Sequence, residues 1–152
     1  MKIAFALLLL MASLSAAAMP AMQRSGSVAW MCAGVGSDER RALDELRPRV
    51  PLEVLFVTAK RGAYVSDVEL SVYRDGDREP LLRVTADGPE CLLSAPPGAY
   101  RIDARYGGTT RTARATIARA AGPARKLAFT FPDEAWDGIR ASPEEKAEAA
   151  KP

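Results

Sequence analysis

Two cysteines, Cys32 and Cys91, carry the most reactive side chains of this chain. In an oxidising compartment two thiols of one domain tend to form a disulfide. A Cys32–Cys91 bond would close a loop of about 60 residues and stabilise the fold by about 2–4 kcal/mol. The alternative is a buried free thiol at Cys91, which shares the inward parity of Leu93. No Cys-x-x-Cys motif is present, which argues against a redox role.

The sequence contains no histidine. This absence excludes Ser-His-Asp and Cys-His nucleophile systems, histidine-ligated zinc and histidine general bases. Two cysteines alone cannot hold a four-cysteine zinc ion or an iron–sulfur cluster. A carboxylate-only metal site or a lysine-based mechanism stays open, although no spacing of residues supports one. We therefore predict a protein that is not an enzyme, with no catalytic residues, no metal and no cofactor.

Arginines with outward parity on predicted strands form the candidate binding face. If these strands are neighbours, the arginines could bind an anionic polymer or an acidic protein surface. The alternative is an ordinary solvated face with cross-strand ion pairs, because Asp103 lies among the arginines. Tyr64, Tyr73 and Trp136 are a weaker candidate, an aromatic platform for sugars. The four candidate residues are Arg83, Arg101, Arg105 and Arg114.

The charge balance argues against a nucleic-acid partner. The 152 residues include 21 basic and 19 acidic side chains, a net charge of +2. Lys2 is the one charged residue among the first eighteen, so the remainder is close to neutral. Nucleic-acid-binding proteins normally carry a larger basic excess. The length and composition are those of one globular domain with a single core.

Residues 1–18 are typical of a secretory signal peptide. Lys2 provides the positive start, residues 3–14 are apolar, and residues 16–18 are three alanines suited to cleavage. The apolar run is about a dozen residues, whereas a membrane helix needs about 20. An uncleaved anchor is the alternative. We expect cleavage near Ala18, a periplasmic or secreted location, and membrane contact only through the signal peptide during export.

The segments around the predicted domain differ in character. Residues 19–36 form an N-terminal segment, of which 19–27 look flexible and 28–32 either add an edge strand or tuck in. Residues 132–152 form an acidic, alanine-rich tail that is predicted to be flexible and disordered. Trp136 is the exception in this tail, since a tryptophan either docks on the domain or stays free there.

A leading helix over residues 37–47 opens the predicted domain, which extends from 37 to 131. Ser37 is the expected N-cap, and the acids Asp38 and Glu39 favour the first turn of a helix. Pro48 is expected to end the helix, because the residue before a proline disfavours helical geometry. A helix of about three turns needs a sheet to pack on.

Alternating apolar and polar residues, punctuated by turns, predict strands after Pro51. Residues 100, 102, 104 and 106 face inward and residues 101, 103 and 105 outward. A turn of Pro96, Pro97 and Gly98 comes before Tyr100. No helix-length segment separates the strands, so mainly antiparallel pairing is expected. The seven strands are predicted at about 52–58, 67–74, 80–86, 90–95, 99–106, 109–118 and 124–131.

Three stretches resemble a known family. Residues 92–100, Leu-Leu-Ser-Ala-Pro-Pro-Gly-Ala-Tyr, resemble the Leu-Pro-Pro-Gly-x-Tyr turn of carboxypeptidase regulatory-like domains. Residues 34–40 and 62–68 are similar to stretches of small exported proteobacterial proteins with this domain. The resemblance covers roughly residues 30–131. It implies an all-β fold, a seven-stranded antiparallel, prealbumin-like (transthyretin-like) β-sandwich with a short N-terminal α-helix, and an interaction module without peptidase activity.

Three functional hypotheses follow. The first is a non-enzymatic exported module that binds an envelope protein or polysaccharide of unknown identity. The second is a structural accessory subunit of an envelope complex that adds an edge strand to its partner. The third is a small hydrolase with unusual catalytic residues, against which the missing histidine and the lack of paired acids argue.

Overall fold

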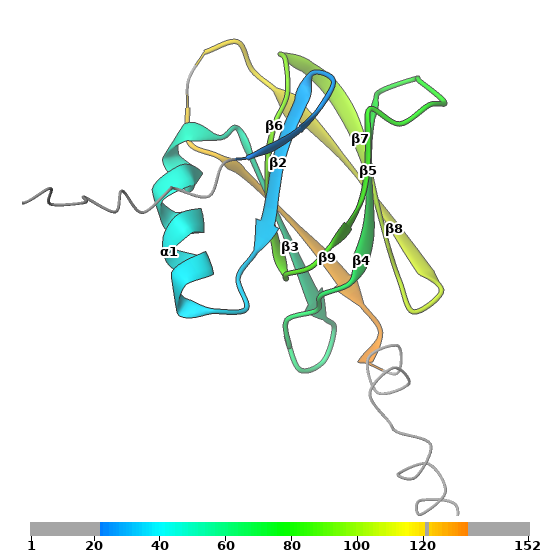
Figure 1. The fold of residues 1–152 in the computed structure, drawn as a ribbon. Helices are drawn as coiled ribbons and strands as arrows, with labels where there is room; N and C mark the ends of the chain where they lie inside the picture. Colours follow the sequence, from blue (N-terminus) through cyan, green and yellow to red (C-terminus); the bar gives the residue numbers. More distant parts are fainter. Residues whose placement is uncertain (1–21, 121, 134–152) are drawn as a thin grey trace, which may run out of the picture.

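Two β-sheets pack face to face, and one α-helix lies outside them (Figure 1). The computed structural model describes residues 22–120 and 122–133. The predicted signal peptide, Trp136 and all of the predicted tail beyond Asp133 therefore lie outside the described residues. Within them, the prediction of an all-β sandwich with a short helix is confirmed.

The five-stranded sheet has the order β1-β2-β6-β3-β9, and the four-stranded sheet has the order β5-β4-β7-β8. The bounds of the first sheet are β1 (Gln23–Ser25), β2 (Val28–Ala33), β6 (Glu90–Ser94), β3 (Leu52–Thr58) and β9 (Arg125–Phe131). Those of the second are β5 (Leu82–Ala86), β4 (Val68–Arg74), β7 (Gly98–Tyr106) and β8 (Thr109–Ile117).

The seven predicted strands correspond to β3 through β9, but β1 and β2 were not among them. Residues 23–25, expected in a flexible segment, pair with β2 as the outermost strand of the sheet. β2 is consequently an interior strand between β1 and β6 instead of an edge. Its side chains are buried on both faces, which is the pattern of a covered strand. The sandwich therefore begins well before residue 37.

The sheets are mainly antiparallel, as expected, but one parallel pair of strands departs from the fully antiparallel sandwich that the resemblance implies. β3 pairs with β9 in parallel, from Leu52 opposite Arg125 to Thr58 opposite Phe131. Parallel strands need a long crossover, which the sequence was expected to lack because it has no helix between the strands. Here the whole four-stranded sheet, together with β6, lies between β3 and β9 in the chain and provides that crossover.

The main core lies between the two sheets. Phe56, Phe131 and Tyr100 are its largest fully buried side chains. Cys32 on β2 and Cys91 on β6 are direct partners in the register, and they form the predicted disulfide. The bond crosses two neighbouring strands inside the core, and the described residues contain no free cysteine. A disulfide is typical of an oxidising compartment.

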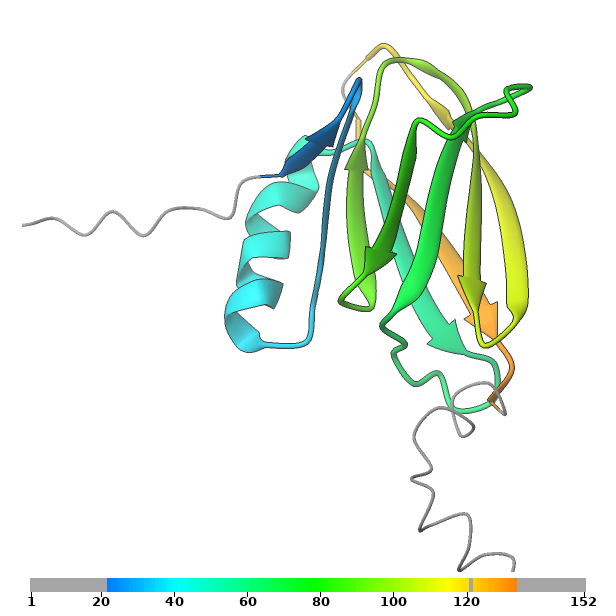
Figure 2. The same ribbon diagram turned by 45° about the vertical axis from the view of Figure 1, so that its right-hand side comes forward.

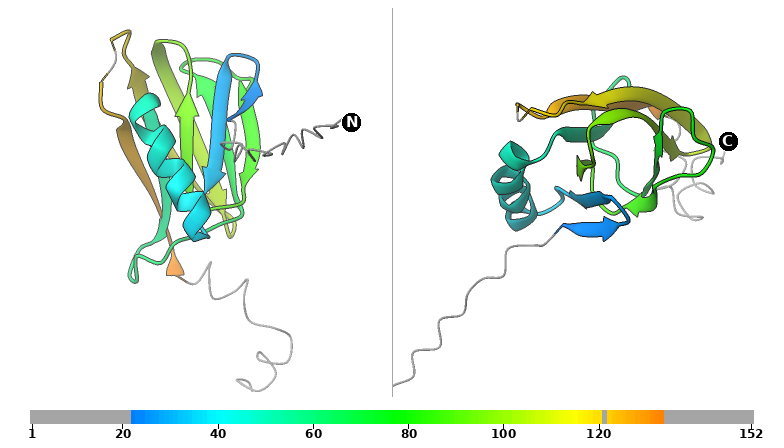
Figure 3. Two further views of the ribbon diagram at one scale, coloured as in Figure 1. Left: turned by 60° about the vertical axis from the view of Figure 1, so that its left-hand side comes forward. Right: turned by 90° about the horizontal axis from the view of Figure 1, so that it is seen from above.

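A second, smaller core lies on the other side of the five-stranded sheet, under α1 (Ser37–Leu46) (Figure 3). Leu43 is fully buried there and packs with Leu92 of β6 and with Val50. The prediction that the helix needs a sheet is thus confirmed. A 3-10 turn, η1 (Arg47–Arg49), follows the helix and contains Pro48.

The predicted N-cap is wrong by one residue. Gly36 is the N-cap of α1, and no side chain caps it. Instead, a carboxylate oxygen of Glu39 accepts the backbone N–H groups of Gly34 and Val35, each at 3.0 Å. The long side chain of a glutamate in the first turn can reach back to the N–H groups of residues before the helix. The short side chain of Ser37, at the first helical position, does not make these hydrogen bonds. These bonds hold the pKa of Glu39 below its usual value.

Two tight turns bracket β7. Gly107 and Gly108 join β7 to β8 with φ angles of 52° and 78°, the left-handed pair that a two-residue hairpin of the primed type requires. At the other end of β7, the Tyr100 hydroxyl donates a hydrogen bond of 2.6 Å to the carbonyl oxygen of Pro96. The Pro96, Pro97, Gly98 turn is therefore fastened to the strand that follows it.

Candidate functional site

The outer face of the four-stranded sheet faces away from the core, and no described helix covers it (Figure 2). All four candidate arginines lie on this face. Residues directly opposite each other in paired strands point to the same side of a sheet. Arg83 and Asp103 are both opposite Ser71, and Arg114 is opposite Arg101. We define the outer face by its outward side chains: Glu69, Ser71, Tyr73, Arg83, Thr85, Arg101, Asp103, Arg105, Thr110, Thr112, Arg114 and Thr116.

A hollow of about 480 Å³ lies on this face, over β5, β4 and β7. Two of the candidate arginines, Arg83 and Arg105, line it from opposite sides of β4. Between them are carboxylates and hydroxyl groups, which can accept and donate hydrogen bonds. The remaining lining residues are Glu69, Ser71, Tyr73, Val84, Thr85, Asp103 and Thr110.

Three of the four arginines have acidic partners. Arg105 lies 3.9 Å from Glu69, and both side chains are more than 60% exposed. Such exposed pairs contribute little stability and can be replaced by a ligand at low cost. Arg101 lies 3.5 Å from Asp103, and Arg114 lies 3.2 Å from Asp75 in the turn after β4.

Arg83 differs from the other three arginines. Among the described residues, no ion pair or hydrogen bond of its guanidinium to a side chain is found. It lies on β5, the edge strand of the sheet, at the wall of the hollow. A guanidinium without a partner retains its full capacity for a carboxylate or phosphate group.

The aromatic platform is not formed. The guanidinium of Arg101 covers the Tyr73 ring at 4.1 Å from its centroid, and Tyr73 is buried. Tyr64 lies in the β3–β4 connection, at one end of the sandwich, and not on the outer face. Trp136, the third residue of this hypothesis, is outside the described part of the chain.

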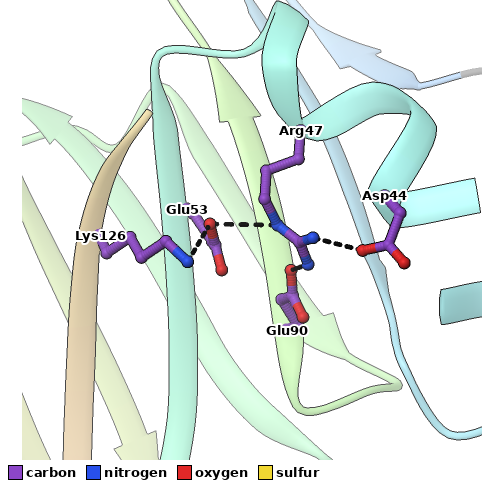
Figure 4. A network of polar contacts seen from close by, with 5 residues as sticks. All are labelled: Asp44, Arg47, Glu53, Glu90 and Lys126. Atoms are coloured by element: carbon purple, nitrogen blue, oxygen red, sulfur yellow. Dashed lines mark hydrogen bonds and ion pairs between the residues drawn. The ribbon is translucent and has the colours of Figure 1, made fainter. Parts of the chain in front are cut away.

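A polar network that the sequence did not reveal lies on the opposite side of the molecule (Figure 4). Arg47 of η1 reaches three carboxylates: Asp44 of α1, Glu90 of β6 at 2.5 Å, and Glu53 of β3 at 3.2 Å. Lys126 of β9 approaches the same Glu53 oxygen at 3.4 Å. The carboxylates raise the pKa of Arg47, Glu90 contributing most.

This network fastens the helical segment to three strands of the five-stranded sheet. Glu53 is only 9% exposed, and its charge is balanced by Arg47 and Lys126. Arg47 Nε and Glu53 Oε2 are within ion-pair distance, but their geometry is not that of a hydrogen bond. A hollow of about 570 Å³ adjoins the network beside Pro48 and Pro123. In the sequence, this network was signalled by Glu53, an acid within the apolar run of residues 52–57. A charge that is buried with such a strand requires a partner.

Other site types find little support in the described residues. No group of three or more cysteine, aspartate or glutamate side chains there has the arrangement of a metal site. None of the described helices is both long and apolar enough to cross a membrane. A scan against models of known families and a search of curated proteins both find no match. The resemblance to carboxypeptidase regulatory-like domains and the prealbumin-like topology therefore stay predictions.

Proposed function

We propose that this protein is a non-enzymatic β-sandwich module of the cell envelope that binds an anionic polysaccharide through its outer face. The observation that carries the proposal is the hollow of about 480 Å³, with the unpartnered Arg83 on one side and the exposed Arg105 on the other. Arginine binds carboxylate and phosphate groups in a two-pronged geometry. The serine and threonine hydroxyls between them suit the hydroxyl groups of sugars.

Export is part of this proposal. The features of residues 1–18 and the Cys32–Cys91 disulfide both favour a periplasmic or secreted location. In that location the available anionic polymers are the charged glycans of the envelope. Since Glu69 and Asp103 also line the hollow, a ligand that alternates acidic groups with hydroxyl groups fits better than a uniformly charged chain. The nearly neutral charge balance continues to argue against nucleic acid.

The experiment is binding of the purified protein to polygalacturonate, a carboxylated polysaccharide, with neutral dextran as the control polymer. We expect retention on polygalacturonate that weakens as salt is added, because exposed charges are screened. Arg83→Ala combined with Arg105→Ala should weaken binding about tenfold. Arg41→Ala combined with Arg49→Ala is the matched control, since it removes the same two charges from α1 and η1 on the other side of the molecule. Equal binding by both variants, or no retention at low salt, would refute the proposal.

Edge-strand addition to a partner protein is the weaker alternative. The five-stranded sheet ends in β1, which has only three residues, and short edge strands disfavour pairing with other chains. At another edge, the Arg111 side chain on β8 donates a hydrogen bond to the Thr130 carbonyl oxygen of β9. Cross-linking in cells followed by mass spectrometry separates the two ideas: a stoichiometric protein linked to a sheet edge favours the accessory subunit.

A further inference from the structure

The hollow of about 570 Å³ beside the Arg47 network lies at the start of β3 and β9. Its volume is in the range of small-molecule sites. Its surface is mostly apolar, and Pro48, Pro123 and Ala124 are among the residues that line it. The charged side chains that line it all belong to the network: Asp44, Arg47, Glu53 and Lys126.

The hollow lies on the same side of the five-stranded sheet as α1. Glu53 is opposite Leu92 of β6, which packs in the second core under the helix. Lys126 of β9 is the direct partner of Glu53 on its other side. Residues opposite each other in paired strands share one side of a sheet, so Glu53 and Lys126 both point to the helix side. In Figure 4 the Glu53 carboxylate lies between Lys126 and Arg47.

Glu53 has unused hydrogen-bonding capacity in this hollow. Its side chain is 9% exposed, and its Oε2 atom is within ion-pair distance of Arg47 and Lys126. Within the part of the chain that the structure describes, however, this oxygen accepts no hydrogen bond. Buried carboxylate oxygens normally accept at least one hydrogen bond. The site therefore lacks an N–H or O–H donor aimed at Glu53 Oε2.

The charge of the network favours a cationic donor. Its contacts join three carboxylates, those of Asp44, Glu53 and Glu90, with two cations, Arg47 and Lys126. One negative charge is thus in excess. Arg47 is shared among all three carboxylates, whereas Lys126 approaches Glu53 alone, at 3.4 Å, with a side chain that is 71% exposed. Such an exposed ion pair is weak, so the Lys126 ammonium group is easily displaced.

We propose that this hollow binds an aliphatic primary ammonium group, which takes the place of the Lys126 ammonium and donates a hydrogen bond to Glu53 Oε2. An ammonium group has three donors and forms strong hydrogen bonds with carboxylates. The apolar stem of the ligand lies along Pro48, Pro123 and Ala124. The excess negative charge disfavours an anion here. The site is separate from the outer face and does not depend on the proposed polysaccharide binding.

An amide NMR titration of the purified protein with hexylamine at low salt tests the proposal. Hexan-1-ol and hexanoate, which have the same chain length, are the control probes. Hexylamine should shift the amide resonances of Ala124 and Lys126 in a saturable way. The alcohol and the carboxylate should bind about tenfold more weakly or not at all, because neither brings a charged donor. Glu53→Gln, which keeps the shape of the side chain, should weaken hexylamine binding about tenfold.

Lys126→Ala tests the same site without altering a buried group. It should tighten hexylamine binding about threefold, because the competing ammonium group is gone. Lys60→Ala is the matched control, since it removes the same charge beyond the other end of β3 and should leave this binding unchanged. Equal affinities of these two variants would overturn the proposal. Equal binding of hexan-1-ol and hexylamine, or the absence of shifts around the hollow, would also overturn it.

The source of the ammonium group is decided by a second probe. N-acetyl-lysine methylamide carries the same group on a peptide unit. If it binds more tightly than hexylamine, with the same dependence on Glu53, the ligand is a lysine side chain of a polypeptide. If hexylamine binds more tightly, the ligand is a free amine. Arg83→Ala combined with Arg105→Ala should leave both affinities unchanged, which keeps this test independent of the outer face.

Discussion

The two sheets of this protein differ in what covers them. Strands β3 and β6 of the five-stranded sheet bury side chains on both faces, because α1 and η1 lie over the side that faces away from the main core. Strands β4 and β7 of the four-stranded sheet mostly alternate between buried and exposed residues. One sheet is thus a covered layer and the other has an open face.

Because of this difference, we expect the covered sheet to contribute most of the stability and the open sheet to contribute recognition of the proposed polysaccharide. The covered sheet contains the disulfide, the second core and the Arg47 network, all of which resist opening. The open sheet presents charged and hydroxyl side chains whose mutual contacts are weak and exposed. Substitutions in the covered sheet should therefore change the free energy of unfolding, whereas those on the outer face should change binding.

The largest effect is expected from the helix cover. Leu43→Ala removes a fully buried side chain between α1 and β6 and should lower the free energy of unfolding by about 2–5 kcal/mol. Urea denaturation followed by circular dichroism measures this change. Glu45→Ala on the exposed side of the same helix is the control. A loss below 1 kcal/mol, roughly the level of a surface substitution, would mean that the helix is not a structural cover.

The disulfide should come next. Replacing both Cys32 and Cys91 by alanine should cost about 2–4 kcal/mol, since the bond closes a long loop across the covered sheet. The wild-type protein under reducing denaturing conditions should show a similar loss of stability. The double variant should be insensitive to reductant, and a dependence of its stability on reductant would contradict this account.

The Arg47 network should contribute less. Arg47→Met leaves the buried Glu53 with only Lys126 and should cost about 1–3 kcal/mol in denaturant titration. Adding Glu53→Leu should recover much of this loss, because the unpaired buried carboxylate is then gone. If the double variant is as unstable as the sum of the two single variants, the interaction between Arg47 and Glu53 is not the cause.

Glu39 should show a pH-dependent contribution. Its folded-state pKa is lowered by the backbone N–H groups of Val35 and Gly34, so its stabilisation is complete above the ordinary glutamate pKa. That stabilisation is lost as the pH falls through the lowered folded-state pKa. The stability difference between wild type and Glu39→Gln should therefore shrink steadily in acid, as thermal unfolding at a series of pH values can measure. A constant difference would contradict the assignment.

The smallest change in stability is expected on the open sheet. Arg83→Ala and Thr112→Ala should each alter the free energy of unfolding by no more than about 0.5 kcal/mol, because both side chains are exposed. Urea titration of each variant provides the test. A large loss of unfolding free energy in Arg83→Ala would show that this residue stabilises the fold, and it would contradict the proposed difference between the two sheets.

Local sequence patterns were sufficient to predict the features that depend on a single strand, turn or helix. The alternation of residues 100–106, the Gly107–Gly108 turn and the helix before Pro48 all follow from neighbouring residues, and the structure has each of them. The outward parity of Arg83, Arg101, Arg105 and Arg114 likewise follows from the period of a strand. Parity could not reveal that Asp75 and Glu69 lie beside two of these arginines, because strand pairing decides it.

The sequence by itself determined the segments that form β3 through β9, the lack of histidine chemistry and the presence of two cysteines able to bond. Only the tertiary structure decided the parallel β3–β9 pair, the interior position of β2, and the meeting of Arg47 with Glu53 and Glu90. The physical reason is the distance along the chain over which each effect acts. Side-chain period and turn chemistry act over a few residues, whereas these contacts join segments whose burial depends on the complete arrangement of both sheets and the helix.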